Sequence, residues 1–236
     1  MSLKEKFIFN FIEDDRWKYI ADGLLATLKV TFFAVLLGIL LGVVIAIVRS
    51  TYDKNGSSMR GLSKFVLSVF NFICKVYLTV IRGTPVVVQL MIMYYVILVS
   101  STNKTLVAVL AFGLNSSAYV AEIFRSGIMS IDEGQFEAGR SLGFNYVQTM
   151  WYIITPQAFK NVLPALANEF IVLLKETSVA GYVGLMDLTK GGDIIRGRTY
   201  QPFMPLIGIA VIYLVMVLFF TWLVGILERR LRNSER

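Results

Sequence analysis

The sequence contains no histidine and only one cysteine, Cys74, among its 236 residues. A single cysteine cannot form a disulfide within the chain, and without histidine the chain has no Cys/His framework for a metal ion. The absence of histidine also excludes metalloprotease and Ser-His catalytic arrangements. An enzyme that works inside the membrane is therefore the weakest interpretation of this sequence, and no metal site is expected.

Charged residues are also scarce. They make up 17% of the chain, whereas hydrophobic residues make up 56% and the mean hydropathy is +0.66. Long stretches carry no charge at all, namely 30 to 48, 83 to 103, 105 to 121 and 199 to 227. Because about 20 apolar residues span the hydrocarbon core as a helix, we expect an all-α membrane protein that crosses the bilayer several times.

The hydropathy pattern predicts about five transmembrane helices. They are placed at about 22 to 49, 86 to 101, 105 to 128, 156 to 174 and 202 to 227. Segment 60 to 82 is different, since polar residues recur in it every three or four positions: Lys64, Ser68, Asn71, Lys75, Thr79 and Arg82. On a helix they form one polar stripe. We interpret this segment as an interfacial or protein-packed lead-in to the 86 to 101 span, broken at Pro85; the alternative is a sixth span.

Basic residues near the ends of the spans predict the orientation. They cluster after the first span and at the C-terminus, at Arg49, Lys54, Arg60, Lys64, Arg229, Arg230, Arg232 and Arg236. Lysine and arginine are enriched on the cytoplasmic side, so we expect five spans with the N-terminus outside and the C-terminus in the cytoplasm. Lipid headgroups and this bias explain the net charge of +7 better than nucleic acid does.

Residues 132 to 156 then form a cytoplasmic loop with its own helices. Asp132 followed by Gln135 fits a capping box that starts a short helix, and Gly143 can take the left-handed conformation that ends it. Asn145 followed by Gln148 repeats the box and starts the next helix. The pattern predicts helix, tight turn, helix.

The first of these short helices has two distinct faces. Phe136, Gly139 and Gly143 share one face, where small residues allow close approach, and Glu137 and Arg140 are spaced to form an i, i+3 pair. These features are typical of a docking element, although a solvated loop with ordinary caps fits the geometry equally well.

The stretch "EAGRSLGFNYVQTMWYIITP" resembles the EAA loop of ABC transporter permeases. Gly139 stands where that loop usually has alanine, and Thr155 where it usually has leucine. Three further stretches, "RGTPVVVQL", "SSAYVAEIFRSGI" and "KETSVAGYVG", resemble the permeases of the polar amino acid uptake family, which includes histidine, glutamine and arginine permeases. The four motifs follow one another in order between residues 20 and 227.

This resemblance implies a single permease domain over 1 to 236, with the fold of a type I ABC importer, in the bacterial inner membrane. It also implies that 132 to 144 is a coupling helix docking onto an ATPase through Glu137, Ala138, Gly139, Arg140 and Gly143. The chain has no phosphate-binding G-x-x-x-x-G-K-[ST] loop, so ATP and Mg²⁺ would bind to a separate pair of ATPase subunits and no cofactor to this chain. Further implied partners are a second permease, identical or paralogous, and an extracytoplasmic amino-acid-binding protein.

Candidate substrate residues lie on the third predicted span. Asn115, Tyr119 and Glu122 share one helix face, and an ionised carboxylate inside the bilayer needs a cavity or a partner. Glu122 is predicted to help bind an amino acid; the alternative is that it pairs with Arg125.

Two further candidates, Thr177 and Ser178, follow the fourth span. They could cap a re-entering helix that faces a substrate carboxylate, or serve as structural caps that hold a loop.

An ion-coupled secondary carrier is the main competing function. Such a carrier needs an internal inverted repeat and buried coupling carboxylates. The sequence shows no such repeat and offers only Glu122 and Glu169 as candidates.

Overall fold

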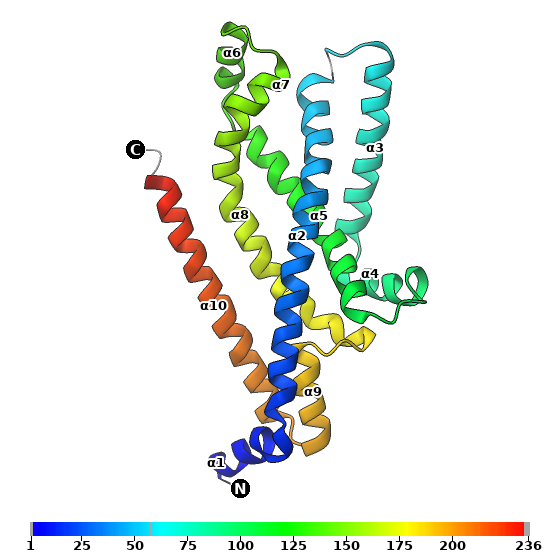
Figure 1. Cartoon of the computed structure of the whole chain (residues 1–236), viewed down its shortest axis with the longest axis vertical. Coiled ribbons are helices and arrows are strands. Elements are labelled where there is room, and N and C mark those ends of the chain that lie inside the picture. The colour runs from blue at the N-terminus through cyan, green and yellow to red at the C-terminus, as the bar shows by residue number, and fades with distance from the viewer. Residues whose placement is uncertain (1, 57, 234–236) are drawn as a thin grey trace.

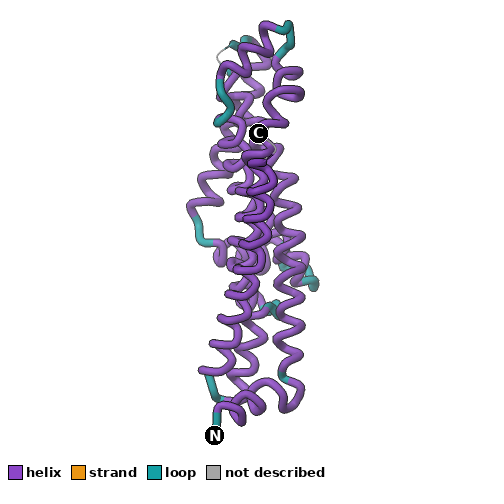
Figure 2. Tube along the Cα trace, turned by 90° about the vertical axis from the view of Figure 1, so that its left-hand side faces the viewer, coloured by secondary structure: helices purple, strands orange, loops and turns teal. Residues whose placement is uncertain are grey.

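The computed structural model describes residues 2–56 and 58–233, and every regular element in this part of the chain is helical (Figures 1 and 2). The longer helices are α2 (Trp17–Asn55), α3 (Gly61–Gly83), α5 (Lys104–Met129), α8 (Thr155–Glu176), α9 (Leu188–Thr199) and α10 (Phe203–Asn233). The shorter ones are α1 (Leu3–Phe7), α4 (Val86–Ile92), α6 (Glu133–Ser141) and α7 (Tyr146–Thr149). Single-turn 3-10 or π segments η1 (Ile8–Ile12), η2 (Glu13–Asp15), η3 (Met93–Ile97), η4 (Met150–Ile154) and η5 (Thr177–Val183) join several of them.

The centre of the molecule is the packing of α2 against α5. α2 has 39 residues, about 58 Å at the rise of an α-helix. Its small residues let the two backbones approach closely: a Cβ added at Gly42 would lie 2.6 Å from Val120, and one at Gly38 2.9 Å from the Ser116 hydroxyl. Small residues at helix contacts are typical of membrane proteins, where van der Waals packing holds helices together.

About five helices cross the membrane, as predicted. Among the described residues, four helices are long and apolar enough to do so: α2, α3, α5 and α10. α8 is less apolar, but its 22 residues run from the α6–α7 end of the molecule between α5 and α10 (Figure 1). α8 is the fifth.

The second of these spans is not where the sequence placed it. Segment 60 to 82, interpreted as a lead-in, forms the 23-residue helix α3, whereas the predicted span at 86 to 101 contains only the 12-residue run Val86–Ile97. That run is about 18 Å long, short of the roughly 30 Å hydrocarbon core. Pro85 interrupts the helix between them, as predicted. Segment 60 to 82 is therefore itself a span, as the alternative interpretation held, and the number of spans stays at five because the run at 86 to 97 is too short to be one.

The contacts made by α3 explain why the second span lies at this helix and not at 86 to 101. Asn71 is buried and accepts a 2.7 Å hydrogen bond from Arg49 of α2, and the Tyr77 hydroxyl lies 2.7 Å from both the Leu114 carbonyl and the Ser117 hydroxyl of α5. On the other side of α3, Phe72 and other apolar side chains are exposed. Asn71 of the stripe and the adjacent Tyr77 therefore face neighbouring helices, whereas Lys64, Lys75, Thr79 and Arg82 are exposed and the apolar face remains free for lipid or another protein.

The ends of the helices fall into two groups (Figure 1). One end of the molecule holds α6, α7, the end of α2 and the start of α3; the other holds α1 and α9, and α10 runs from that end back towards α6. Loop 129 to 155 therefore lies at the same end as the basic residues that follow the first span, as predicted. Arg236 of the C-terminal basic cluster lies outside the described residues.

Candidate functional site

The loop at 132 to 156 folds as the predicted helical hairpin. The Asp132 carboxylate accepts a 2.7 Å hydrogen bond from the Gly134 amide at the start of α6. The predicted capping box is incomplete there, because the Gln135 side chain accepts from Gln157 of α8 at 3.1 Å instead. Asn145 and Gln148 do form a full box, with both bonds at 2.9 Å.

Gly143 makes the tight turn between the two short helices. Its φ is +80°, the left-handed region that favours glycine. The Phe144 amide donates to the Gly139 carbonyl at 3.0 Å, and the Gly143 amide to the Arg140 carbonyl at 2.9 Å. These two bonds are those of a Schellman motif, so the predicted helix end is confirmed.

The small-residue face of α6 packs against its own chain. Phe136 and Gly139 are buried, and a Cβ added at Gly139 would lie 2.6 Å from the Thr149 side chain of α7. Gly139 therefore serves the contact between α6 and α7.

The opposite face of the hairpin is open to solvent. Glu137, Ala138, Arg140 and Gly143 are exposed there, and among the described residues no ion pair joins Glu137 to Arg140, so the expected i, i+3 pair is absent. Four of the five predicted docking residues are thus accessible to a partner, and Gly139 is not.

Three exposed apolar side chains lie on the same hairpin and were not predicted as docking residues. Leu142, Val147 and Trp151 are 69%, 71% and 70% exposed. Val147 and Trp151 are spaced i, i+4 after a helix start, so they share a face. This i, i+4 spacing is the sequence pattern that could have identified Val147 and Trp151 as part of an exposed apolar face.

The string G-R-S-L-G at 139 to 143 has the spacing of a hydrolase nucleophile elbow. Such an elbow places its serine on a sharp turn from a strand to a helix. Ser141 instead lies in α6, no strand occurs in the described part of the chain, and the sequence has no histidine. The match is one of spacing alone.

A cavity of about 550 Å³ lies between α2, α3 and α5. Two predicted substrate residues, Tyr119 and Glu122, line it. The other lining residues are Arg49, Lys75, Leu78, Thr79, Arg82 and Gly83. Three basic side chains and one carboxylate thus face the same space, which we call the α2–α3–α5 cavity.

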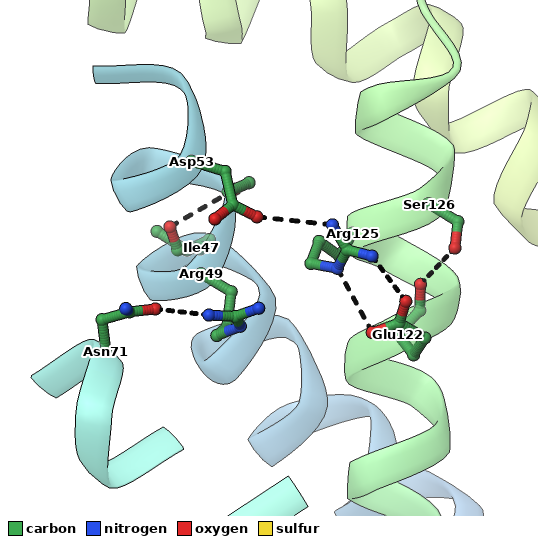
Figure 3. Close-up of polar contacts among 8 residues, drawn as sticks. Ile47, Arg49, Asp53, Asn71, Glu122, Arg125 and Ser126 are labelled. Atoms are coloured by element: carbon green, nitrogen blue, oxygen red, sulfur yellow. Dashed lines mark hydrogen bonds and ion pairs between the residues drawn. The ribbon is translucent and has the colours of Figure 1, made fainter. Parts of the chain in front are cut away.

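Glu122 is held by Arg125 (Figure 3). The Arg125 guanidinium donates to the two carboxylate oxygens of Glu122 at 2.6 and 3.2 Å and lies 3.3 Å from the Asp53 carboxylate of α2. Glu122 therefore pairs with Arg125, as the alternative interpretation expected, and it also lines the cavity; its role in binding an amino acid stays a prediction. The guanidinium of Arg82 stacks over the Tyr119 ring, 5.7 Å from its centroid.

The basic side chains of the cavity were missed as binding candidates by the sequence analysis. Lys75 and Arg82 belong to the polar stripe of α3, so the stripe was the signal for them. Nothing local marks Arg49, which reaches the cavity from α2.

Asn115 lies apart from the cavity lining. Its buried side-chain amide donates to the Gln89 side chain of α4 at 2.9 Å, and Gln89 in turn donates to the Ile81 carbonyl at 2.7 Å and the Thr84 hydroxyl at 2.8 Å. These bonds tie α5 to the junction of α3 and α4. Asn115 thus supports the wall of the cavity in this geometry.

Thr177 and Ser178 lie elsewhere in the molecule. The buried Thr177 hydroxyl donates to the Leu174 carbonyl at 2.9 Å, and η5 continues directly from α8, so these residues start no re-entering helix. The next helix, α9, begins instead at Asp187, whose carboxylate accepts from the Thr189 and Lys190 amides. Ser178 lines a separate cavity of about 330 Å³ beside α9.

Glu169, the other carboxylate inside a span, is a helix-packing partner. It is buried on α8 and accepts a 2.8 Å hydrogen bond from the Ser116 hydroxyl of α5. Among the described residues no cluster of three or more His, Cys, Asp or Glu side chains is placed to hold a metal ion.

Comparisons with known proteins agree with this architecture. Residues 38–233 match the profile of the family described as "Binding-protein-dependent transport system inner membrane component". The arginine transport system permease protein ArtQ of Bacillus subtilis is 37% identical over 92% of this chain and 94% of its own length. A putative glutamine transport system permease protein of Rickettsia typhi is 36% identical, over 90% and 93%.

Solved structures show the same fold. A chain from the crystal structure of an amino acid ABC transporter with histidines is 43% identical and superposes with a TM-score of 0.79, over 90% of this chain and 94% of that one. A chain of the MetNI methionine ABC transporter is 17% identical, with a TM-score of 0.76 over 93% and 99%, which is a likeness of fold alone. The chain therefore belongs to the family of inner membrane components of binding-protein-dependent transport systems, as a multi-pass permease subunit.

Proposed function

We propose that the chain is the permease subunit of an ATP-driven importer for polar amino acids. Relatives named for arginine and glutamine transport, and a 43% identical structure named for histidines, support this class of substrate. The observation that carries the proposal is the α2–α3–α5 cavity, because it presents charges of both signs between three helices that are long and apolar enough to cross the membrane.

The cavity suits a zwitterion. Its volume of about 550 Å³ falls in the range of small-molecule sites. Glu122 is the partner for the α-ammonium group or a basic side chain, with Tyr119 beside it, and Arg49, Lys75 and Arg82 are partners for the α-carboxylate. Asn115 acts indirectly, through Gln89.

The second candidate site is weaker in this geometry. The Thr177 hydroxyl already donates a hydrogen bond to the Leu174 carbonyl, and Ser178 lines the smaller cavity beside α9. We assign both residues a structural role at the end of α8.

The family description implies an ATPase and a binding protein as partners. We propose that a pair of ATPase subunits carries ATP and Mg²⁺ and docks on the exposed face of the α6–α7 hairpin, through Glu137, Ala138, Arg140 and Gly143, with Leu142, Val147 and Trp151 as apolar contacts. Gly139 keeps the hairpin closed. The hairpin end is cytoplasmic, the N-terminus is outside, and the binding protein meets the α1–α9 end.

A second permease chain, identical or paralogous, completes the path. One chain with about five spans leaves large apolar faces of α3 and α10 exposed, and a symmetric or pseudosymmetric pair buries such faces. An ion-coupled carrier is disfavoured, because Glu169 is already bonded to Ser116 and the sequence shows no internal inverted repeat.

Co-purification of the ATPase tests the docking face. We expect Glu137→Arg to reach the membrane and fold normally, because its side chain is exposed, but to lose most of the ATPase that wild type retains. Glu13→Arg makes the same charge change at the opposite end of the molecule and serves as the control. Wild-type levels of ATPase on the Glu137→Arg protein would overturn this docking site.

A further inference from the structure

Two neighbouring residues at the end of α2, Asp53 and Lys54, reach in different directions. Lys54 forms an ion pair with Glu133 in the first turn of α6, and its ammonium lies over the Phe136 ring, 4.6 Å from the centroid. Asp53 lies 3.3 Å from Arg125 on α5. The tip of α2 is therefore attached to the hairpin on one side and to α5 on the other.

The contact with α5 leads directly to the cavity. Arg125, held by Asp53, also holds both carboxylate oxygens of Glu122, which lines the α2–α3–α5 cavity (Figure 3). Ion pairs on either side of the neighbouring residues Asp53 and Lys54 thus connect Glu133 of the hairpin, through the backbone of α2, to Glu122 at the wall of the cavity.

These contacts are partly shielded from solvent. The Lys54 side chain is 13% exposed, although that of its partner Glu133 is 71% exposed, and those of Asp53 and Arg125 are each 27% exposed. Screening by water and salt weakens fully exposed pairs, which contribute little, and it is smaller for partly buried ones. The Asp53–Arg125 contact is therefore the better shielded of the two ion pairs, and the position of the Lys54 ammonium over the Phe136 ring adds a second contact to the more exposed pair.

We propose that Asp53 and Lys54 are positioning residues that link movement of the α6–α7 hairpin to the state of Glu122. A shift of α6 pulls the tip of α2 through Lys54, and Asp53 passes the shift to Arg125. Arg125 then sets whether the Glu122 carboxylate is held or released to a substrate cation. This inference rests on the proposed function.

The test uses the complete importer, purified through its ATPase subunit so that only assembled complexes are compared, and reconstituted with its binding protein. We expect Lys54→Gln to keep ATP hydrolysis but to lower the amino acid taken up per ATP hydrolysed by about threefold or more. Lys54→Arg, which retains the charge, should stay near wild type. Lys64→Gln is the matched control, since Lys64 is an exposed lysine at the same end of the molecule.

A double-mutant cycle separates this role from general weakening. If Lys54 acts through Glu133, the double variant Lys54→Gln/Glu133→Gln loses no more coupling than Lys54→Gln alone. Independent, multiplying losses would overturn the inference, and so would an unchanged ratio of uptake to hydrolysis in Lys54→Gln. A wild-type complex without amino-acid-stimulated ATP hydrolysis would instead refute the proposed function itself.

Discussion

Glu122 lines the α2–α3–α5 cavity while it is paired with Arg125. An ionised carboxylate inside the bilayer costs roughly 3 kcal/mol on insertion scales, and the two bonds from Arg125 offset part of that cost. The same carboxylate still faces a cavity that basic residues surround. Under the proposed function, a substrate cation competes with Arg125 for this carboxylate.

Replacement of Glu122 by glutamine should discriminate between substrates. Because hydrogen bonds to a charged acceptor are stronger than those to a neutral one, we expect Glu122→Gln to lower uptake of a cationic amino acid roughly fivefold to tenfold more than uptake of a neutral one. Competition assays with radiolabelled amino acids measure this ratio, and Asp22→Asn, near the outer end of α2, is the control. An equal loss for both substrates would mean that Glu122 serves only Arg125.

The three predicted substrate residues on α5 show what residue spacing can and cannot predict. The i, i+4, i+7 spacing placed Asn115, Tyr119 and Glu122 on one face of α5, but spacing does not say what lies opposite each of them. Gln89 stands opposite Asn115, and the cavity lies opposite Tyr119 and Glu122. Arg49 joins the cavity only through tertiary packing, so no local pattern marks it.

Among the elements, α9 depends on one buried cap. Asp187 is buried and accepts bonds from the amides of Thr189 and Lys190. Burial raises the pKa of the Asp187 carboxyl despite these bonds, whereas Arg196 and Lys190 lower the pKa of the more exposed Asp193 on the same helix. The pKa values of these two carboxyls, one at the start of α9 and one within it, are therefore shifted in opposite directions.

Two substitutions of Asp187 should separate the effect of its capping hydrogen bonds on stability from the effect of its buried charge. Asp187→Ala removes the acceptor and should destabilise the protein by about 1 kcal/mol. Asp187→Asn keeps an acceptor and removes the buried charge, so we expect stability close to wild type. Thermal unfolding in detergent measures both, and equal destabilisation by the two variants would contradict the separation.

The pH dependence follows from the direction of each pKa shift. The folded pKa of Asp187 is raised, so its contribution to stability is present below its unfolded pKa and is lost as the pH rises through its folded pKa. Asp187→Asn should abolish that loss. The pKa of Asp193 is lowered, so its contribution is present above its unfolded pKa and is lost as the pH falls through its folded pKa.

The α3–α4 region shows which elements a sequence predicts well. The break at Pro85 was predictable, because proline lacks the backbone donor that a helix interior needs. The assignment of the span was not, because α3 looks interfacial until Asn71 is seen to bond to Arg49, and Tyr77 to Ser117 and the Leu114 carbonyl. The Gly143 turn and the Asn145–Gln148 box of the α6–α7 hairpin were predictable because their hydrogen bonds are local, whereas the box at Asp132 is incomplete because Gln135 bonds to Gln157 of α8.

At the scale of the whole molecule, the arrangement of helix ends fixes one topology. The α6–α7 hairpin lies at the end that carries the basic tip of α2, and the junction of α9 and α10 lies at the other (Figure 1). The prediction of five spans is correct although the second span was assigned to 86 to 101 instead of α3. With either assignment the chain crosses the membrane once between α2 and α5.

Cysteine labelling tests this topology. Cys74 is the only native cysteine, so a Cys74→Ser protein accepts single probes at exposed positions, such as Leu142→Cys in the hairpin turn and Tyr200→Cys at the α9–α10 junction. A membrane-impermeant maleimide added to intact cells should label Tyr200→Cys and not Leu142→Cys. The reverse pattern would place the hairpin outside and contradict docking of a cytoplasmic ATPase.

The central claim is that this chain is a passage whose movement is driven by a separate ATPase. Accumulation of a labelled amino acid in proteoliposomes tests it most directly. We predict that the complete complex, with its binding protein and ATP, concentrates the amino acid against its gradient, and that this chain without the ATPase does not, even when an ion gradient is imposed. Concentrative uptake by the chain alone would contradict the account.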